Sequence, residues 1–326
     1  MPREIGLLGA TTIAARAVVE PARRLSDVRV RGVAASDPGR AEAFRATHDL
    51  PLAYPTYRAL LADDRIDVVY VSLHNSAHAQ WAAAAASAGK HVVVEKPLCL
   101  GRRELHGIHH AAAAAGVHVV EAVMTARHPW QDAVRDIVAA GELGTLVEVR
   151  SHIAFEVPDR AGYRFRPELG GGALHDTASY WLDALQGTVG LDKAAGTGRA
   201  AFDGPHGVDL SFTASLEWPN GLRADLHAAL TGPYRADHEF RCTAGRVRLR
   251  NFLRPAAGPF PLNLVITPEH GARRVLSFPA QAYYERQLDR VMAWLDSPED
   301  PDPGVTQRIA LMETAYQDAL GVHLGW

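Results

Sequence analysis

IDVVYVSL, at residues 66–73, is apolar at nearly every position, which is typical of a strand that is buried on both faces. We expect further strands at residues 4–8, 28–34, 91–95 and 117–122. Helices are expected between them at residues 13–24, 40–47, 78–88 and 102–115. Strands that alternate with helices over about 120 residues predict a doubly wound parallel sheet. Such sheets bind ligands beyond the carboxyl ends of their strands, so the residues that follow each strand are candidates for a binding site.

The pattern changes after Ala122. We expect a helix, a strand, a series of alternating strand segments and two final helices, at residues 129–140, 146–155, 208–278, 283–295 and 306–322. The predicted fold is therefore α/β with two domains. We expect residues 1–122 to form a dinucleotide-binding Rossmann domain, and residues 123–326 to form an α+β domain with a large, mostly antiparallel open sheet.

The chain has 326 residues, of which 47% are hydrophobic and 22% charged, and its formal net charge is -3. This composition is typical of a soluble globular protein and argues against a broad basic surface for nucleic acid or a membrane. We find no signal-peptide pattern, no apolar run of the about 20 residues that span a bilayer, and no disulfide framework, so we expect a cytoplasmic protein. No metal site is expected, because His106, His109 and His110 lack a recognisable ligand motif.

Residues 9–14 (GATTIA) follow the first strand, where a dinucleotide-binding fingerprint of the form GxGxxG/A belongs. Gly9 permits a tight turn, and the amides at the start of the next helix can bind a pyrophosphate. Thr11 replaces the middle glycine and brings a Cβ to a place where the backbone usually approaches phosphate. We expect cofactor contacts from Gly9, Thr11, Thr12 and Ile13.

The residues after the second strand report on the ribose of the cofactor. Ser36 and Arg40 could bind the 2′-phosphate of NADP, although Asp37 beside them would repel it. No acidic residue stands at the strand end to bind the 2′-hydroxyl of NAD, so we favour NADP(H) and keep NAD(H) as the alternative. Further cofactor contacts are expected after the next two strands, at Leu73, His74, Asn75, His78, Glu95 and Lys96.

Three stretches closely resemble one enzyme family: AGKHVVVEKP at residues 88–97, EAVMTARHP at 121–129 and GGGALHDTASY at 170–180. With them, nearly the whole chain is similar to the glucose-fructose oxidoreductase/inositol dehydrogenase (Gfo/Idh/MocA) superfamily. The resemblance implies an NAD(P)-dependent oxidoreductase in which the lysine of EKP, here Lys96, reaches the active site. It also implies functional roles for an aspartate after the glycines and a tyrosine four residues later.

Residues 155–172 look like the branch that contains nucleotide-sugar 3-ketoreductases of deoxysugar biosynthesis. The resemblance therefore implies reduction of a keto group on a nucleotide-activated 3-keto-deoxysugar. The dihydrodiol dehydrogenase and xylose dehydrogenase branches share the tyrosine, so oxidation of a free sugar or a trans-dihydrodiol is the alternative. A second alternative is a non-catalytic dinucleotide-binding regulatory protein, which the departure at Thr11 would allow.

The expected helix at residues 173–186 ends at Gly187 and carries Asp176 and Tyr180 together on the face opposite its apolar stripe. A carbonyl that accepts hydride develops negative charge on oxygen and needs a proton donor. Tyr180 is our candidate general acid. The phenol pKa of about 10 is high for this task, and a nearby Lys96 ammonium would lower it. Asp176 would hold a sugar hydroxyl or Lys96, and the competing interpretation is an ordinary solvated helix face.

Substrate contacts are expected from His128, Arg164, Arg166, His175 and Asp176. The two arginines could receive a sugar diphosphate, because planar guanidinium groups suit phosphate oxygens, and the alternative is a solvated loop. For His128 the alternative is a histidine that is satisfied near a helix N-terminus. The resemblance also implies a homodimer or homotetramer that associates through the open sheet face, with neither nucleic acid nor a membrane as a partner.

Overall fold

The computed structural model describes residues 2–295 and 302–321. The chain divides into two compact units, Met1–Met124 with Tyr284–Thr306 and Thr125–Tyr283 with Gln307–Trp326. The sequence-based division placed all of residues 123–326 in the second domain, whereas the segment 284–306 is part of the first unit. Within the described ranges, none of the helices combines the length and the apolar character needed to cross a membrane.

The first unit is built on a six-stranded sheet in which all neighbouring strands pair in parallel, so the predicted doubly wound sheet is confirmed. In spatial order its strands are β3 (Leu52–Tyr54), β2 (Val28–Ala34), β1 (Arg3–Leu8), β4 (Val68–Val71), β5 (His91–Glu95) and β6 (Val119–Ala122). The strand order reverses between β1 and β4, and the crevice beyond their carboxyl ends is the place where such sheets bind ligands.

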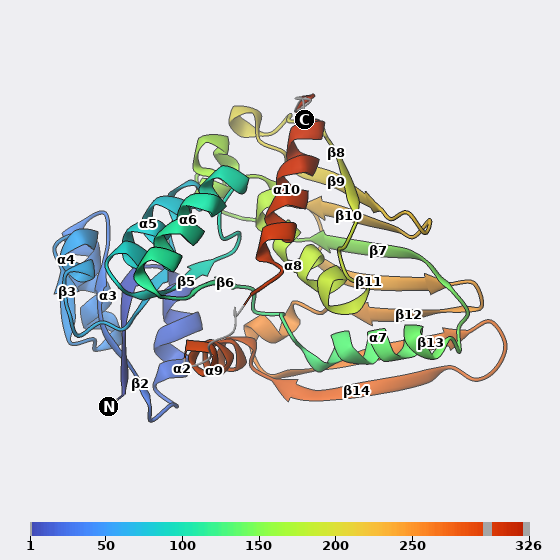
Figure 1. Ribbon diagram of the computed structural model, residues 1–326, viewed down its shortest axis with the longest axis horizontal. Coiled ribbons are helices and arrows are strands. Elements are labelled where there is room, and N and C mark those ends of the chain that lie inside the picture. Colours follow the sequence, from blue (N-terminus) through green and yellow to red (C-terminus); the bar gives the residue numbers. More distant parts are fainter. Residues whose placement is uncertain (1, 296–301, 322–326) are drawn as a thin grey trace. The chain divides into compact units, whose positions relative to one another are not determined.

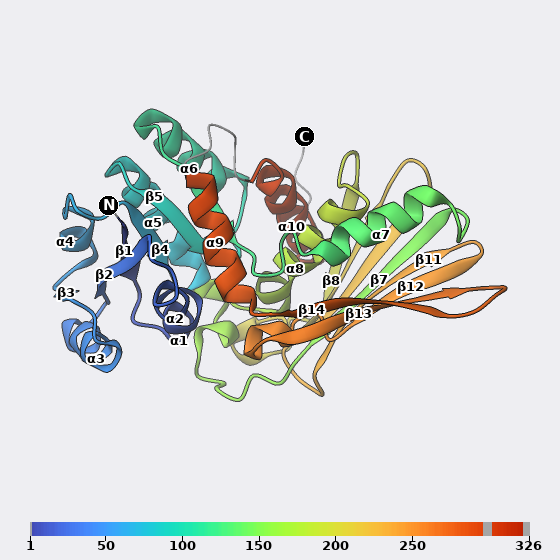
Figure 2. The ribbon, with the colours of Figure 1, turned by 90° about the horizontal axis from the view of Figure 1, so that it is seen from below.

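Helices cover both faces of this sheet (Figures 1 and 2). They are α1 (Thr12–Ala14), the π-helix η1 (Ala15–Val19), α2 (Glu20–Ala22), α3 (Pro38–His48), α4 (Tyr57–Leu61), α5 (Asn75–Ser87) and α6 (Arg102–Ala115). The first three run on without a break and form one helical segment, residues 12–22. Strand β3 and helix α4 were not predicted, because elements of three and five residues are too short to show a period.

Helix α9 (Tyr283–Leu295) belongs to the core of the first unit although it lies far along the chain. Its spacing of apolar residues forms one stripe that is buried with β1 and its neighbours, at Leu288, Val291, Met292 and Leu295. The helix itself was predicted at these residues. Its period reveals an apolar face but not which sheet that face covers, so the sequence alone assigned it to the wrong unit.

The second unit contains an eight-stranded sheet that is antiparallel except for the pair β7–β10. In spatial order its strands are β14 (Arg274–Gln281), β13 (Phe260–Pro268), β12 (Gly245–Arg250), β11 (Arg235–Cys242), β7 (Leu146–Ala154), β10 (Arg223–Ala229), β9 (Ser211–Glu217) and β8 (Ala195–Ala200). The expected large, mostly antiparallel sheet is therefore confirmed.

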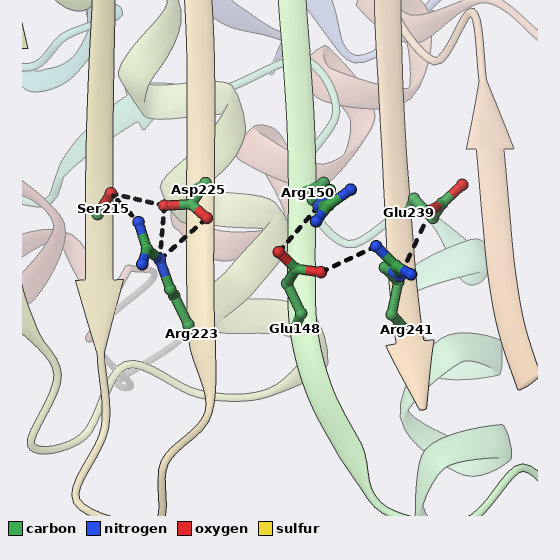
Figure 3. A network of polar contacts seen from close by, with 7 residues as sticks. All are labelled: Glu148, Arg150, Ser215, Arg223, Asp225, Glu239 and Arg241. Atoms are coloured by element: carbon green, nitrogen blue, oxygen red, sulfur yellow. Dashed lines mark hydrogen bonds and ion pairs between the residues drawn. The ribbon is translucent and has the colours of Figure 1, made fainter. Parts of the chain in front are cut away.

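Three helices of the second unit pack on one face of this sheet, namely α7 (Pro129–Ala140), α8 (Ala173–Thr188) and α10 (Val305–Ala319) (Figures 1 and 2). The final predicted helix extended to residue 322, which lies outside the described residues. On the opposite face the side chains are charged and pair both along and across strands (Figure 3). There Glu148 binds Arg150 at 2.8 Å and Arg241 at 3.3 Å, and Arg223 binds Asp225 at 3.1 Å.

Two glycine contacts explain where the second unit departs from prediction. Strand β8 was not predicted because it is glycine-rich, and a Cβ at Gly198 would overlap the backbone oxygen of Ala315 in α10. Helix α8 continues through Gly187, where a helix end was expected. A Cβ at Gly187 would come within 2.5 Å of Gln131 Oε1, so this glycine serves the close packing of α8 on α7.

Candidate cofactor and substrate sites

The turn after β1 is tight because Gly9 adopts a φ of +115° and lies against the end of β4. A Cβ at Gly9 would come within 2.6 Å of the Ser72 carbonyl oxygen, so the position requires glycine. The chain therefore enters the helical segment 12–22 directly from the strand, with the amides of Thr12 and Ile13 in its first turn. Such amides lack acceptors within their own helix, and this arrangement fits a pyrophosphate.

Thr11 caps this helical segment. Its Oγ1 accepts a hydrogen bond from Ala14 N–H at 3.1 Å and shares another, of 2.8 Å, with Ser72 Oγ. A threonine cap stabilises a helix by about 1 kcal/mol. The departure from the glycine fingerprint thus has a structural reason, because the side chain that replaces the glycine is held by the helix start and the neighbouring strand.

The end of β2 brings Ser36 and Arg40 together with a residue that sequence reasoning missed, Tyr57. Burial raises the pKa of the Tyr57 phenol, while hydrogen bonds from Ser36 and the positive charge of Arg40 act in the opposite direction. Arg40 also donates to the Ala10 carbonyl oxygen at 3.4 Å. Asp37, which was expected to repel a phosphate, uses its carboxylate to cap α3 at 3.0 Å. The group offers two hydroxyls and a guanidinium, which suit a 2′-phosphate.

His78 ties the residues after β4 to the segment after β5. Its Nδ1 lies 2.8 Å from the Pro97 carbonyl oxygen, and its Nε2 lies 3.1 Å from that of Leu73. Burial lowers the pKa of His78 to about 4, so the ring is neutral at pH 7 and donates to one carbonyl at a time. His74 precedes α5 and pairs with Ser76 through Nδ1 at 3.0 Å. His78 is therefore a structural link beside the expected cofactor contacts.

Lys96 is buried and follows Glu95, whose carboxylate forms a short hydrogen bond with the Tyr70 hydroxyl. Tyr284, from α9, lies close to both residues. Burial raises the pKa of the Tyr284 phenol to about 12, with Glu95 adding to the effect and Lys96 opposing it. The placement of α9 in the first unit thus brings a phenol that the sequence did not suggest to the neighbourhood of the predicted lysine.

In the second unit, glycines 170–172 precede α8. Asp209, from a distant segment, accepts hydrogen bonds from the first amides of this helix. Asp209 Oδ2 accepts from Leu174 N–H at 3.0 Å, and its backbone oxygen accepts from Ala173 N–H at 3.0 Å. Its Oδ1 is buried and has no hydrogen-bond partner in the described part of the chain. Gly172 has a φ of +109°, and a Cβ there would overlap this oxygen. Burial raises the pKa of Asp209 to about 7.

Helix α8 is buried on nearly all sides, which contradicts the competing interpretation of a solvated helix face. Asp176 is 3% exposed and accepts a hydrogen bond from Arg164 Nε at 2.7 Å. Tyr180, one turn later, is half-buried. The pair Asp176 and Tyr180, singled out by its spacing, therefore lies in a region with restricted access to water, where charges interact more strongly than on a surface.

The other predicted substrate residues are held elsewhere. His128 is buried and caps α7, because its Nδ1 accepts from Trp130 N–H at 3.2 Å. His175 is buried, bonds the Gly171 carbonyl oxygen through Nδ1 at 3.1 Å and packs its ring on that of Tyr316. Arg166 is exposed and pairs with the neighbouring Glu168 at 2.6 Å. For both histidines these contacts favour a structural role over the expected substrate contact.

Each unit thus brings together its own set of predicted residues. The first unit gathers the phosphate turn, the ends of β2, β4 and β5, and Lys96. The second unit gathers Arg164, Asp176 and Tyr180. A dinucleotide site in the first unit fits this geometry, because the tight turn at Gly9 leads directly to the first amides of the helical segment 12–22.

Comparison with protein families gives two matches along the chain. Residues 3–123 match the oxidoreductase family with an NAD-binding Rossmann fold, and residues 132–248 match the GFO/IDH/MocA C-terminal domain. Among solved structures, a 3-ketoreductase of Actinomadura kijaniata in complex with NADP and TDP-benzene is similar, with a TM-score of 0.88 and 23% identity. The match covers 97% of this chain and 98% of that one, and it shows that the fold is shared.

Two curated relatives differ in their substrates. A D-xylose 1-dehydrogenase (NADP(+)) of Haloferax volcanii is 31% identical over 95% of this chain and 94% of its own length. A dTDP-3,4-didehydro-2,6-dideoxy-alpha-D-glucose 3-reductase of Saccharopolyspora spinosa is 30% identical over 97% of both. Overall identity therefore does not separate a free-sugar dehydrogenase from a nucleotide-sugar reductase.

Proposed function

The chain belongs to the GFO/IDH/MocA family of oxidoreductases, and we propose that it reduces a keto group of a nucleotide-activated 3-keto-deoxysugar with NADPH. The observation that carries the proposal is the buried helix α8, on which Asp176 and Tyr180 lie beside an arginine. Such a helix offers a proton donor in a charged environment of low water content. Four of the similar curated proteins are dTDP-3,4-didehydro-2,6-dideoxy-alpha-D-glucose 3-reductases, which supports the nucleotide-sugar class.

In this proposal the first unit binds the cofactor. The turn at Gly9 and the first amides of the helical segment 12–22 would hold the pyrophosphate. Ser36, Arg40 and Tyr57 would receive the 2′-phosphate, which distinguishes NADP from NAD. The cofactor, when bound, supplies the hydride that adds to the carbonyl carbon.

Tyr180 would act as the proton donor. When hydride adds to the carbonyl carbon, the C=O π bond breaks and its electron pair moves to oxygen, which takes the phenolic proton to give a hydroxyl. The resulting phenolate recovers a proton from solvent. We propose that the Lys96 ammonium assists Tyr180 and donates to the same developing oxyanion. Asp176 would orient a hydroxyl of the sugar through its carboxylate.

The test is the oxidation of NADPH by the purified protein with dTDP-3,4-didehydro-2,6-dideoxyglucose as substrate. Replacement of Tyr180 by Phe is expected to lower kcat by about 100-fold or more, which is the usual contribution of a general acid, with little change in NADPH affinity. Lys96→Met is expected to have a comparable effect. If Tyr180→Phe retained most of the turnover, Tyr180 would not be the proton donor.

The xylose dehydrogenase relative favours a second candidate, the NADP-dependent oxidation of a free sugar. The same residues would serve, with Tyr180 as phenolate accepting the proton of the sugar hydroxyl. Parallel assays of NADP reduction with D-xylose and of NADPH oxidation with the dTDP-linked keto sugar separate the two candidates. A kcat/KM for xylose that exceeds the value for the nucleotide sugar would contradict the main proposal.

We further propose that two copies of the chain associate through the charged sheet face of Figure 3. This face presents acidic and basic side chains in alternation, and such a pattern can pair with a second copy of itself. Glu148→Arg would place like charges beside Arg150 and Arg241, and we expect it to weaken the dimer in sedimentation equilibrium. Glu20→Arg, at an exposed position of the first unit, is the control. A wild-type monomer would contradict this proposal.

A further inference from the structure

Arg164 and Arg166 were expected to act alike on a sugar diphosphate, but the structure separates them. Arg166 is exposed and pairs with Glu168, two residues along the same loop. Arg164 instead points its guanidinium at α8, where Nε lies 2.7 Å from Asp176 Oδ2. The carboxylate in this pair is buried and the arginine side chain is 36% exposed. An ion pair with one buried member interacts more strongly than a surface pair.

The backbone fixes the position of Arg164. Its carbonyl oxygen accepts from Gly172 N–H at 2.9 Å, which joins the loop to the residue that begins α8. A Cβ at Gly171 would come within 2.6 Å of the carbonyl oxygens of Tyr163 and Arg164, so the glycine allows this close approach. The guanidinium also lies over the Tyr163 ring at 5.0 Å from its centre. The loop, the glycines and the helix therefore hold the arginine in one place.

The charges around Arg164 include the proposed proton donor. The carboxylate of Asp176 is the main cause that raises the pKa of Arg164, and the phenols of Tyr163 and Tyr180 contribute in the same direction. By reciprocity, the guanidinium favours the phenolate form of Tyr180. The nearby Asp176 carboxylate acts in the opposite sense, since a negative charge disfavours a phenolate. The arginine offsets this effect while it holds the carboxylate.

We propose that Arg164 is a positioning residue that holds the Asp176 carboxylate on the helix face of Tyr180, the proposed proton donor, rather than a ligand of the sugar diphosphate. The inference rests on the proposed function in that it assigns Tyr180 the role of proton donor. It predicts that loss of Arg164 leaves Asp176 uncompensated and raises the pKa of Tyr180, so that the phenol becomes a weaker acid.

The central variant is Arg164→Gln, with Arg164→Lys as the conservative replacement and Arg160→Gln as the matched control. Arg160 lies on the same loop, is exposed and pairs with Glu156 at 3.4 Å. We expect Arg164→Gln to lower kcat by about tenfold to 100-fold and to move the alkaline limb of the kcat profile up by about one pH unit. Arg164→Lys keeps the charge and is expected to restore the limb and most of kcat. Arg160→Gln is expected to change neither.

Binding of thymidine diphosphate to the NADPH complex separates positioning from phosphate recognition. A positioning role predicts that calorimetry gives Arg164→Gln the wild-type affinity within about twofold. Loss of a direct arginine–phosphate contact would weaken binding by about tenfold or more, and this result would overturn the proposal. Because part of the effect passes through Asp176, the loss of kcat caused by Arg164→Gln should be smaller in the Asp176→Asn background than in wild type.

An optical titration provides a readout that needs no turnover. The ultraviolet phenolate signal of wild type minus Tyr180→Phe isolates the titration of Tyr180, and the same difference in the Arg164→Gln background should lie at higher pH. An unchanged Tyr180 titration would overturn the inference even if the enzyme is active. If wild type turns over neither keto sugars nor free sugars, the proposed function fails, while the titration still decides the role of Arg164.

Discussion

Two junctions of this chain, residues 9–14 and 170–173, each lead from a glycine into a helix but use that helix in different ways. Both have a glycine at positive φ that lets another segment approach closely, Gly9 towards Ser72 and Gly172 towards Asp209. At the first junction Thr11 caps its own helix, because its Oγ1 accepts from Ala14 N–H. At the second junction, Asp209 accepts hydrogen bonds from the amides of Ala173 and Leu174.

The difference shows that a glycine before a helix is not enough to predict an anion site. The first junction fits a phosphate, because in the described part of the chain the one side-chain cap at this helix start is that of Thr11 on Ala14 N–H. The second junction has a carboxylate of the chain where an anion would bind. Its function is to hold α8, and with it Asp176 and Tyr180, in position.

The largest expected effect concerns the pH dependence of stability at the second junction. The folded-state pKa of Asp209 is raised to about 7, so the folded protein binds more protons than the unfolded chain between about pH 4 and pH 7. Its contribution to stability is present at low pH and is lost as the pH rises through 7, by about 4 kcal/mol in all. Asp209→Asn should remove this slope in urea unfolding curves recorded from pH 5 to pH 8. If the stability of Asp209→Asn still fell with rising pH as in wild type, the raised pKa of Asp209 would not be the cause of the pH dependence.

The next effect concerns the close approach of Gly172 to Asp209. Gly172→Ala is expected to lower the free energy of unfolding by about 3 kcal/mol, from overpacking and an unfavourable φ together. Gly190→Ala is the matched control, since Gly190 also has a positive φ, +78°, and nothing lies within 4 Å of its added Cβ. We expect about 1 kcal/mol there. If urea unfolding gave the same loss of free energy of unfolding in both variants, the close approach of Gly172 to the Asp209 carboxylate would contribute nothing beyond the positive φ.

At the first junction the cap of Thr11 is open to a direct test. Thr11→Ala removes the hydrogen bond to Ala14 N–H and should cost about 1 kcal/mol in thermal or urea unfolding. The affinity for NADPH should stay within about threefold, because the side chain serves the helix. A loss of NADPH affinity much larger than the loss of stability would instead assign Thr11 to the cofactor.

The smallest effect concerns Tyr57. Tyr57→Phe should reduce the preference for NADPH over NADH by about threefold, the low end of the contribution of one hydrogen bond, because Ser36 and Arg40 remain to bind the phosphate. NADH affinity in the same variant is the internal control and should not change. If both affinities fell together, Tyr57 would support the fold of the site and not the recognition of the 2′-phosphate.

Local patterns were enough to predict most of the fold. The apolar run at residues 66–73 and its neighbouring strands indicated the parallel sheet, and the spacing of Asp176 and Tyr180 indicated that they share a helix face. The sequence did not reveal that this face is buried. The burial of this helix face depends on contacts with residues that lie far away in the sequence. Arg164 binds Asp176 from 12 positions away, and Asp209 binds the Leu174 amide from 35 positions away. Likewise the location of α9 depends on a long-range contact with β1, which no local period contains.

A fluorescence titration with NADPH and NADH in parallel, on wild type and on Gly9→Ala, tests the central claim most directly. We expect wild type to bind NADPH more tightly than NADH, and Gly9→Ala to lose binding of both, because its Cβ would displace the turn from Ser72. Preference for NADH would redirect the proposal towards the dehydrogenation of free sugars. Failure of wild type to bind either nucleotide would contradict the account, because the first junction would then not be a dinucleotide site.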